Sequence, residues 1–163
     1  MTSSPPPLPP LEQVHEPDSE LIGKQIVKQE SGGDPRAYNE TSYGPSNPAL
    51  GMYQTLWTTA VEAAERHNVS MPPTHEEYLN DARKQQEIGS ILMNEAMDMA
   101  TKDTPENTPN RLEVIIRKAA AVHYGGPGNM DLWNDRKPQY GGPSMNDYTT
   151  KIWTNYISGA RGY

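Results

Sequence analysis

The stretch that decides the fold is residues 21–35, which read LIGKQIVKQESGGDP. Ile22, Ile26 and Glu30 follow one another at intervals of four residues, so in a helix they lie on one face. The Gly-Gly-Asp-Pro run at the end of the stretch stops a helix, because glycine frees the backbone and proline cannot continue it. The stretch therefore predicts an amphipathic helix that carries a carboxylate on its apolar face, at its last turn.

Capping residues mark where the expected helices begin. Asp18 or Ser19 can cap the first helix, because a short polar side chain there can accept a hydrogen bond from a free N–H group of the first turn. Residues 74–77 (Thr-His-Glu-Glu) and 110–113 (Asn-Arg-Leu-Glu) have the spacing of a capping box. These signals place the starts of three helices.

Helical spacing and helix-breaking residues alternate along the rest of the chain. Residues 34–50 and 125–143 are rich in Gly, Pro and Asn and are expected to be loops. No stretch shows the strict alternation of apolar and polar residues that marks a half-buried strand. We therefore expect an all-α or nearly all-α fold of about five helices, at about residues 19–31, 55–67, 74–100 and 110–124 and in a last segment with Tyr148, Ile152 and Tyr156.

Composition excludes several classes of site and partner. The chain has no cysteine, which excludes disulfides, Cys-ligated zinc and a Cys nucleophile. Its net charge of −7 argues against nucleic acid as a partner, since binding phosphates needs clustered Lys and Arg. The four histidines share no ligand spacing, so neither a metal nor a cofactor is expected. No apolar run reaches the length of about 18 residues that a membrane span needs.

The first 17 residues differ in composition from the rest. They contain six prolines and are expected to form a flexible or polyproline-like leader before a folded domain at residues 18–163. The segment lacks the basic start and apolar centre of a Sec signal peptide. A passive tail is the commoner role for such a segment, and a tether to a larger assembly is the alternative.

Glu30 is the first candidate for chemistry. Burial on an apolar helix face disfavours a charged carboxylate, and a carboxyl group that stays protonated at neutral pH can act as a general acid. The negative end of the helix dipole acts in the same direction. An ordinary exposed glutamate at a helix end would show the same spacing, so the pattern leaves both interpretations open.

Two further segments carry residues that suit sugar binding. Residues 51–54 read Gly-Met-Tyr-Gln before the second helix, and Gln54 can donate and accept hydrogen bonds to hydroxyl or N-acetyl groups. Residues 123–129 read His-Tyr-Gly-Gly-Pro-Gly-Asn, in which an aromatic ring that can stack on a sugar lies beside glycines that let a polymer approach. Core packing, helix capping and a His123 hydrogen-bonded within the fold are the alternatives for these segments.

In this order, the segments resemble the motifs of the goose-type-lysozyme-like lytic transglycosylases, the soluble lytic transglycosylase (SLT) catalytic domain. That family has Glu-Ser at the end of a helix, Gly-Leu-Met-Gln before the next, and later Ala-Tyr-Asn-Ala-Gly-Pro-Gly-Asn. The counterparts here are Glu30-Ser31, residues 51–54 and residues 123–129. The tyrosine near the start of the family's closing helix corresponds to Tyr148. The resemblance implies a lysozyme-like fold of helices around a substrate cleft.

The resemblance covers roughly residues 19–157, and the chain departs from it at several positions in the expected cleft. Tyr53 stands where the family has Met, and the family's Tyr-Asn pair is His123-Tyr124 here. Trp57 stands where a proline is usual. These changes bear on substrate preference more than on the class of reaction.

The resemblance implies a reaction that uses one carboxylate. Glu30 would protonate the oxygen that joins N-acetylmuramic acid to N-acetylglucosamine. It would then take the proton of the C6 hydroxyl, which closes a 1,6-anhydro ring. Ser31 would orient Glu30 or the N-acetyl group. The residues implied in substrate binding are Ser31, Gly51, Met52, Tyr53, Gln54, His123, Tyr124 and Tyr148.

Two alternatives to a transglycosylase remain at this stage. Asp34 and Glu40 follow in the loop and could position a water molecule, which would make the enzyme a hydrolytic lysozyme or endolysin. The commoner role of such residues is loop capping. A chain can also keep a fold and lose its activity, which would leave a structural or wall-binding protein of a virion.

The expected partner is the glycan strand of peptidoglycan. Small size and a Pro-rich leader fit a phage particle component that opens the host wall from the periplasmic side at infection, with the leader bound to a virion or tail assembly. A holin-released endolysin and a wall-piercing enzyme of a secretion machine are the alternatives.

Overall fold

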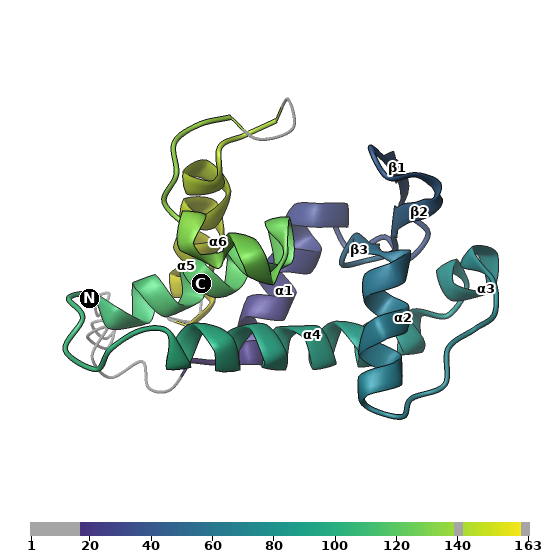
Figure 1. Cartoon of the computed structure of the whole chain (residues 1–163), viewed down its shortest axis with the longest axis horizontal. Helices are drawn as coiled ribbons and strands as arrows, with labels where there is room; N and C mark the ends of the chain where they lie inside the picture. The colour runs from purple at the N-terminus through teal and green to yellow at the C-terminus, as the bar shows by residue number, and fades with distance from the viewer. Residues whose placement is uncertain (1–16, 139–141, 161–163) are drawn as a thin grey trace, which may run out of the picture.

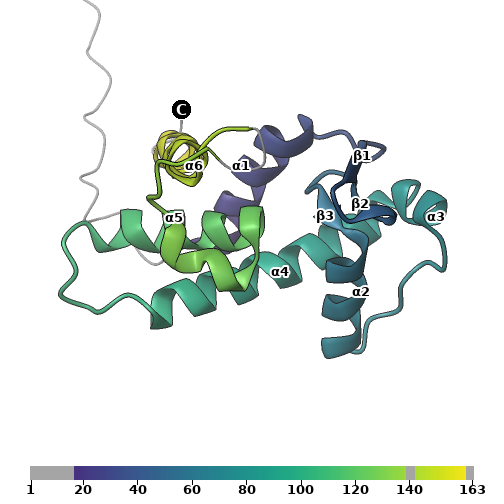
Figure 2. The same ribbon diagram turned by 45° about the horizontal axis from the view of Figure 1, so that its top comes forward.

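The computed structural model describes residues 17–138 and 142–160. Helices dominate these residues and are arranged along the long helix α4 (Ala82–Lys102), as Figures 1 and 2 show. The expectation of a nearly all-α fold is therefore confirmed. The predicted leader lies outside the described residues except for Pro17. Among the described residues, no helix combines the length and apolar character that a membrane span needs.

The first helix, α1 (Ser19–Ser31), begins and ends where its sequence predicts. The Asp18 side chain accepts hydrogen bonds from two N–H groups of the first turn and so caps the helix. Gly32 follows with a φ of 65°, the left-handed conformation that closes a helix and that glycine adopts without strain. Ile22 and Ile26 are fully buried, which confirms the apolar face.

The larger core lies where α1 packs with α4, α5 (Arg111–Gly125) and α6 (Met145–Ala160). α6 runs antiparallel to α1, because its Tyr156 hydroxyl accepts a hydrogen bond from the Asp18 N–H at the start of α1, whereas Tyr148 lies beside the other end. The buried side chains of this core include Ile22, Ile26, Met93, Ala96, Ile115, Ile116, Ala119, Ala120, Ile152 and Tyr156.

A smaller core lies at the other end of α4, under α2 (Trp57–Arg66) and α3 (His75–Leu79). Its buried side chains include Leu50, Ala60, Ala63, Tyr78 and Ile88. α4 contributes Ile88 to this core and Met93 to the larger one, so it joins the two.

The prediction that residues 34–50 form a loop is wrong. They contain strands β1 (Tyr38–Thr41) and β2 (Gly44–Leu50), and β2 also pairs with the short strand β3 (Thr55–Leu56) in an antiparallel sheet of order β1-β2-β3. The strands escape sequence analysis because β2 contains Pro45 and Pro48 and most of the hairpin is exposed. Only the end of β2 is buried, at Pro48 and Leu50, and this is too short for an alternation of apolar and polar residues to stand out.

Two predictions about helix starts are also corrected. Residues 74–100 do not form one helix, because the chain breaks at residues 80–81 and Asp81 caps a new helix by accepting from the Lys84 N–H. Thr74 does cap the short helix before the break. α5 begins after Asn110 as expected, but the Asn110 side chain makes no capping hydrogen bond, since its backbone takes a left-handed φ of 54°.

Candidate active site

Glu30 lies half-buried in the last turn of α1, and α6 places the phenol of Tyr148 beside it. Burial, and then the charge of the Glu30 carboxylate and a hydrogen bond to it, raise the pKa of Tyr148 well above its usual value. Within the described chain, no group meets full hydrogen-bond geometry with the Tyr148 hydroxyl oxygen. Tyr148 and Glu30 are therefore close without a fully formed hydrogen bond, which is common for catalytic groups in a free enzyme.

Tyr124, at the end of α5, packs against the ring of Tyr148. The two rings stack with centroids 4.5 Å apart at an angle of 28°. Tyr124 is half-buried, whereas Tyr148 is only 4% exposed. Three helices thus bring Glu30, Tyr124 and Tyr148 together, as the sequence comparison with SLT domains predicts.

Ser31 links the end of α1 to the turn at residues 51–54. Its hydroxyl lies 2.7 Å from the Met52 carbonyl oxygen and 3.3 Å from that of Val27, and it accepts from the Gly33 N–H. The resemblance to SLT domains predicts that Ser31 orients Glu30 or the N-acetyl group. In the structure, its hydrogen bonds hold the polypeptide on both sides of Glu30.

Gln54 faces Asn39 of β1 rather than open space. Its amide nitrogen donates to the carbonyl oxygens of Ala37 (3.2 Å) and Gly51 (3.0 Å), and its amide oxygen accepts from the Asn39 side chain (2.6 Å). Both amide hydrogens are thus used within the protein. Gln54 holds the hairpin against the turn. In this conformation its amide has no hydrogen left to donate to a sugar, which is the role that the sequence predicts for it.

Gln85 of α4 is a residue that sequence analysis missed. It is fully buried, accepts from the Met52 N–H (2.9 Å), and donates to the carbonyl oxygens of Pro35 (2.8 Å) and Tyr78 (2.9 Å). A Cβ on Gly51 would lie 2.3 Å from the Gln85 amide oxygen and would have to displace this buried amide, and the φ of 76° also favours glycine there. The sequence does contain a sign of its role: Gln85 lies three residues before Ile88, on the apolar face of the helix, where a polar side chain is expected to be buried and hydrogen-bonded.

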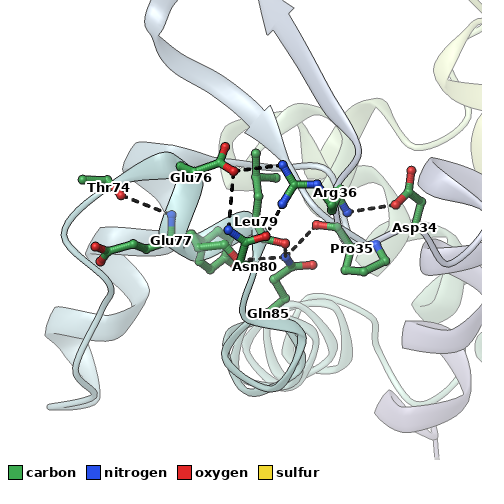
Figure 3. A network of polar contacts seen from close by, with 10 residues as sticks. Asp34, Pro35, Arg36, Thr74, Glu76, Glu77, Leu79, Asn80 and Gln85 are labelled. Carbon is green, nitrogen blue, oxygen red and sulfur yellow. Dashed lines mark hydrogen bonds and ion pairs between the residues drawn. The ribbon is translucent and has the colours of Figure 1, made fainter.

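Arg36 strengthens the same connection from the surface. Figure 3 shows its guanidinium between Glu76 and Asn80 of the α3 region, while Gln85 reaches the neighbouring Pro35 from below. The hydrogen bond from Arg36, and then the Arg36 charge, lower the pKa of the Glu76 carboxyl. The turn that follows Glu30 is therefore tied to both α3 and α4.

Tyr53 packs into the core instead of lining the Glu30 site. Its ring lies between Gly23 of α1 and Gly89 of α4, where a Cβ on Gly89 would fall 2.2 Å from a ring carbon. It also borders a cavity of about 600 Å³ between α1 and α4, and Glu30 is not among the residues that line this cavity. Small residues on two helices thus accommodate the tyrosine where the family has methionine.

His123 contacts the backbone of the turn at residues 51–54. Its Nε2 lies 2.8 Å from the Tyr53 carbonyl oxygen, which can only accept, so Nε2 carries the hydrogen. This is the alternative in which His123 is hydrogen-bonded within the fold. The contact joins the end of α5 to residues 51–54.

Asp34 and Glu40 are the other acids considered for the reaction. Asp34 accepts from the Arg36 N–H and caps its own turn, as expected for its commoner role. Glu40 is exposed on β1. Among the described residues, no three His, Asp or Glu side chains are grouped so that they could hold a metal ion.

Comparison with known proteins adds a family to this geometry. The family model "Transglycosylase SLT domain" matches residues 13–142, which is most of the chain and includes Glu30, residues 51–54 and residues 123–129. The match ends before α6, so Tyr148 lies outside it. No curated protein and no solved structure matches the chain. The chain belongs to the SLT domain family of peptidoglycan lytic transglycosylases.

Proposed function

We propose that this chain cleaves the β-1,4 bond between N-acetylmuramic acid and N-acetylglucosamine in peptidoglycan and leaves a 1,6-anhydro end. The observation that carries the proposal is the half-buried Glu30 at the end of α1, beside the buried Tyr148 hydroxyl. A carboxyl group in this position can donate a proton to a bound substrate and then accept one. Membership of the SLT family supports the substrate and the class of reaction.

Glu30 acts twice in the proposed reaction. Its protonated carboxyl donates to the glycosidic oxygen while the bond from that oxygen to C1 of N-acetylmuramic acid breaks. The carbonyl oxygen of the substrate's own N-acetyl group stabilises the positive C1. The C6 hydroxyl then attacks C1 and gives its proton to the Glu30 carboxylate. The ring closes, Glu30 returns to its starting form, and no water is consumed.

In this proposal the remaining side chains take no part in proton transfer, and they form or hold the surface that binds the sugar. Tyr124, which stacks on the buried ring of Tyr148, offers an aromatic face against which a sugar ring can lie. The turn at residues 51–54 contributes its backbone, because Ser31, Gln54 and Gln85 hold that turn in place by hydrogen bonds. Substrate contacts at these residues stay predictions.

Muropeptide analysis tests the proposal directly. Purified peptidoglycan is incubated with the protein and the products are weighed by mass spectrometry. Anhydro ends, lighter by one water than reducing ends, support the transglycosylase. Reducing ends favour a hydrolase in which Glu40 or Asp34 orients water. No product from any wall type, with the protein folded, favours a wall-binding protein without activity.

We propose a phage particle as the setting, on the basis of the Pro-rich leader at residues 1–17. In that setting the leader binds a tail or virion protein, and the domain acts on the wall from the periplasm. Mass spectrometry of purified virions tests this. An enzyme that appears only in the lysate supports an endolysin instead.

A further inference from the structure

Arg117 is a buried cation in the middle of α5, with four partners around its guanidinium. Nε donates to the Thr149 hydroxyl (3.1 Å), one Nη to Glu113 (3.1 Å), and the other Nη to the Asn146 side-chain oxygen (2.6 Å). Its Cζ lies 4.6 Å from the centroid of the Trp133 ring. The side chain is only 10% exposed, so these contacts replace nearly all of its water.

Two of these partners flank Tyr148 in the first turn of α6. Asn146 and Thr149 lie on either side of it in sequence, and both also bind the segment before α6. The Thr149 hydroxyl donates to the Trp133 carbonyl oxygen (2.6 Å), and the Asn146 N–H donates to that of Asp135 (2.8 Å). Arg117 thus joins α5, residues 133–135 and the turn that carries Tyr148.

The Tyr148 hydroxyl itself has no well-aligned hydrogen bond that would hold it in place. Its position beside Glu30 therefore depends on where the first turn of α6 lies. The far end of α6 is held by the Tyr156 hydroxyl and the Asp18 N–H. The near end is held through Arg117, whose planar fork of donors fixes direction as well as distance.

A buried ion pair is weak evidence for a role in stability. An apolar residue of similar volume is often as stabilising, because it avoids the cost of removing a charge from water. What an arginine provides here is a defined geometry between three segments. Displacement of a catalytic group by about 1 Å can cost up to about a hundredfold in rate.

We propose that Arg117 is a positioning residue for the reaction of Glu30: it holds the first turn of α6 so that the Tyr148 hydroxyl stays against the Glu30 carboxyl. The inference rests on the proposed function of Glu30. Arg117 lies outside the motifs through which the chain resembles SLT domains, and it touches no substrate in this account. It acts on the reaction only through Tyr148.

A double-mutant cycle in kcat tests this dependence. We expect Arg117→Met to lower kcat about tenfold and KM less than about twofold, because positioning rather than binding is lost. In a Tyr148→Phe background, the same substitution should change kcat less than about twofold, since the group it positions is gone. An equal loss of kcat in both backgrounds would overturn the proposal.

Lys118 supplies a matched control. It is the neighbouring buried cation of α5, but its ammonium group binds Asp103 and Thr104 at the end of α4, away from Glu30. Lys118→Met should lower the melting temperature while kcat of the folded protein stays within about twofold. A tenfold loss of kcat from this control would show that burial of any cation in α5 matters, and the specific role of Arg117 would fail.

Two more variants keep the test decisive. Arg117→Lys retains the charge but not the fork, so kcat should fall between the wild type and Arg117→Met. If Arg117→Met does not fold, Asn146→Ala removes one arm of the contact and makes the same comparison with Tyr148→Phe. No effect of Asn146→Ala on kcat would contradict the proposal.

The Tyr148 phenol offers a readout that needs no activity. Its pKa is held high by burial and by Glu30. The tyrosinate absorption of each protein minus that of its Tyr148→Phe form isolates this phenol among the nine tyrosines. Its titration should move to lower pH in Arg117→Met, because a displaced phenol gains water, and should stay in place in Lys118→Met. An unchanged titration in Arg117→Met overturns the inference about Arg117, whether or not the wild type cleaves peptidoglycan. A wild type that cleaves no peptidoglycan refutes only the proposed function.

Discussion

The two sides of the candidate site use their polar groups in opposite ways. On the hairpin side, the polar groups of Ser31, Gln54 and Gln85 form hydrogen bonds within the protein, mainly with backbone groups of residues 35–54. On the helical side, Tyr148 keeps a buried hydroxyl without a well-aligned partner next to Glu30. An unsatisfied buried group costs free energy, so it marks where stability has been given up. The comparison supports the proposal that the hairpin side shapes the site and that the proposed proton transfer takes place on the helical side.

Glu30→Gln gives the largest expected effect on activity and tests the helical side. The amide keeps the shape of the side chain but cannot donate and then accept the proton, so cleavage of peptidoglycan should fall by roughly a thousandfold. Dye release from labelled peptidoglycan measures this, with circular dichroism as the check on folding. A variant with a tenth of wild-type activity would remove Glu30 from the mechanism.

Gln85→Ala gives the largest expected effect on stability and tests the hairpin side. It leaves the Met52 N–H and the Pro35 and Tyr78 carbonyl groups without their partner, which should lower the free energy of unfolding by about 3 kcal/mol. Urea unfolding measures it. The exposed neighbour Gln86 is the control, and Gln86→Ala should change stability by less than about 0.5 kcal/mol. Equal losses would mean that Gln85 holds nothing in particular.

Gly51→Ala separates steric fit from backbone strain on the same side. The new Cβ would meet the Gln85 amide, and the φ of 76° already disfavours any side chain, so we expect a loss of about 2 kcal/mol or more. Gly33→Ala is the matched control, because its φ is 92° but nothing lies within 4 Å of the added Cβ. It should cost about 1 kcal/mol in the same unfolding experiment. Equal costs for the two variants would show that contact with Gln85 contributes nothing.

Tyr148→Phe should lower activity and raise stability together. Removal of the hydroxyl beside Glu30 should reduce kcat about tenfold, while the loss of an unsatisfied buried polar group should raise the free energy of unfolding by up to about 1 kcal/mol. Steady-state kinetics and urea unfolding measure the two quantities. A variant that is less stable than the wild type would show that the hydroxyl is well bonded, and the contrast between the two sides would disappear.

Local signals predicted much of the fold correctly. Asp18 and Gly32 bound α1 as expected, and the glycines after α5 end it, because caps and left-handed glycines act within a few residues of the chain. The hairpin at residues 38–50 was missed because two prolines and an exposed surface hide its pattern. The break at residues 80–81 was missed because apolar spacing continues across it into α4.

The candidate site, like the fold, was predicted from the sequence only in part. The sequence alone, through ordered motifs, determined which segments meet: the end of α1, residues 51–54, and the end of α5. It also determined that a carboxylate stands on an otherwise apolar helix face. The position of the carboxylate follows from spacing along a helix, which is local. The meeting of the three segments is implied by the resemblance of their motifs to the SLT family.

The tertiary structure alone decided what each polar group binds. The three partners of the Gln54 amide lie 3 to 17 residues away, and the Pro35 carbonyl bound by Gln85 is 50 residues away. Tyr148 comes beside Glu30 only because α6 runs antiparallel to α1. Hydrogen bonds are short-ranged and directional, so a side chain that can donate to sugar will donate to a backbone carbonyl wherever packing brings one within about 3 Å. The type of amino acid determines which groups its side chain can bind, and the packing of the fold determines which of them it does bind.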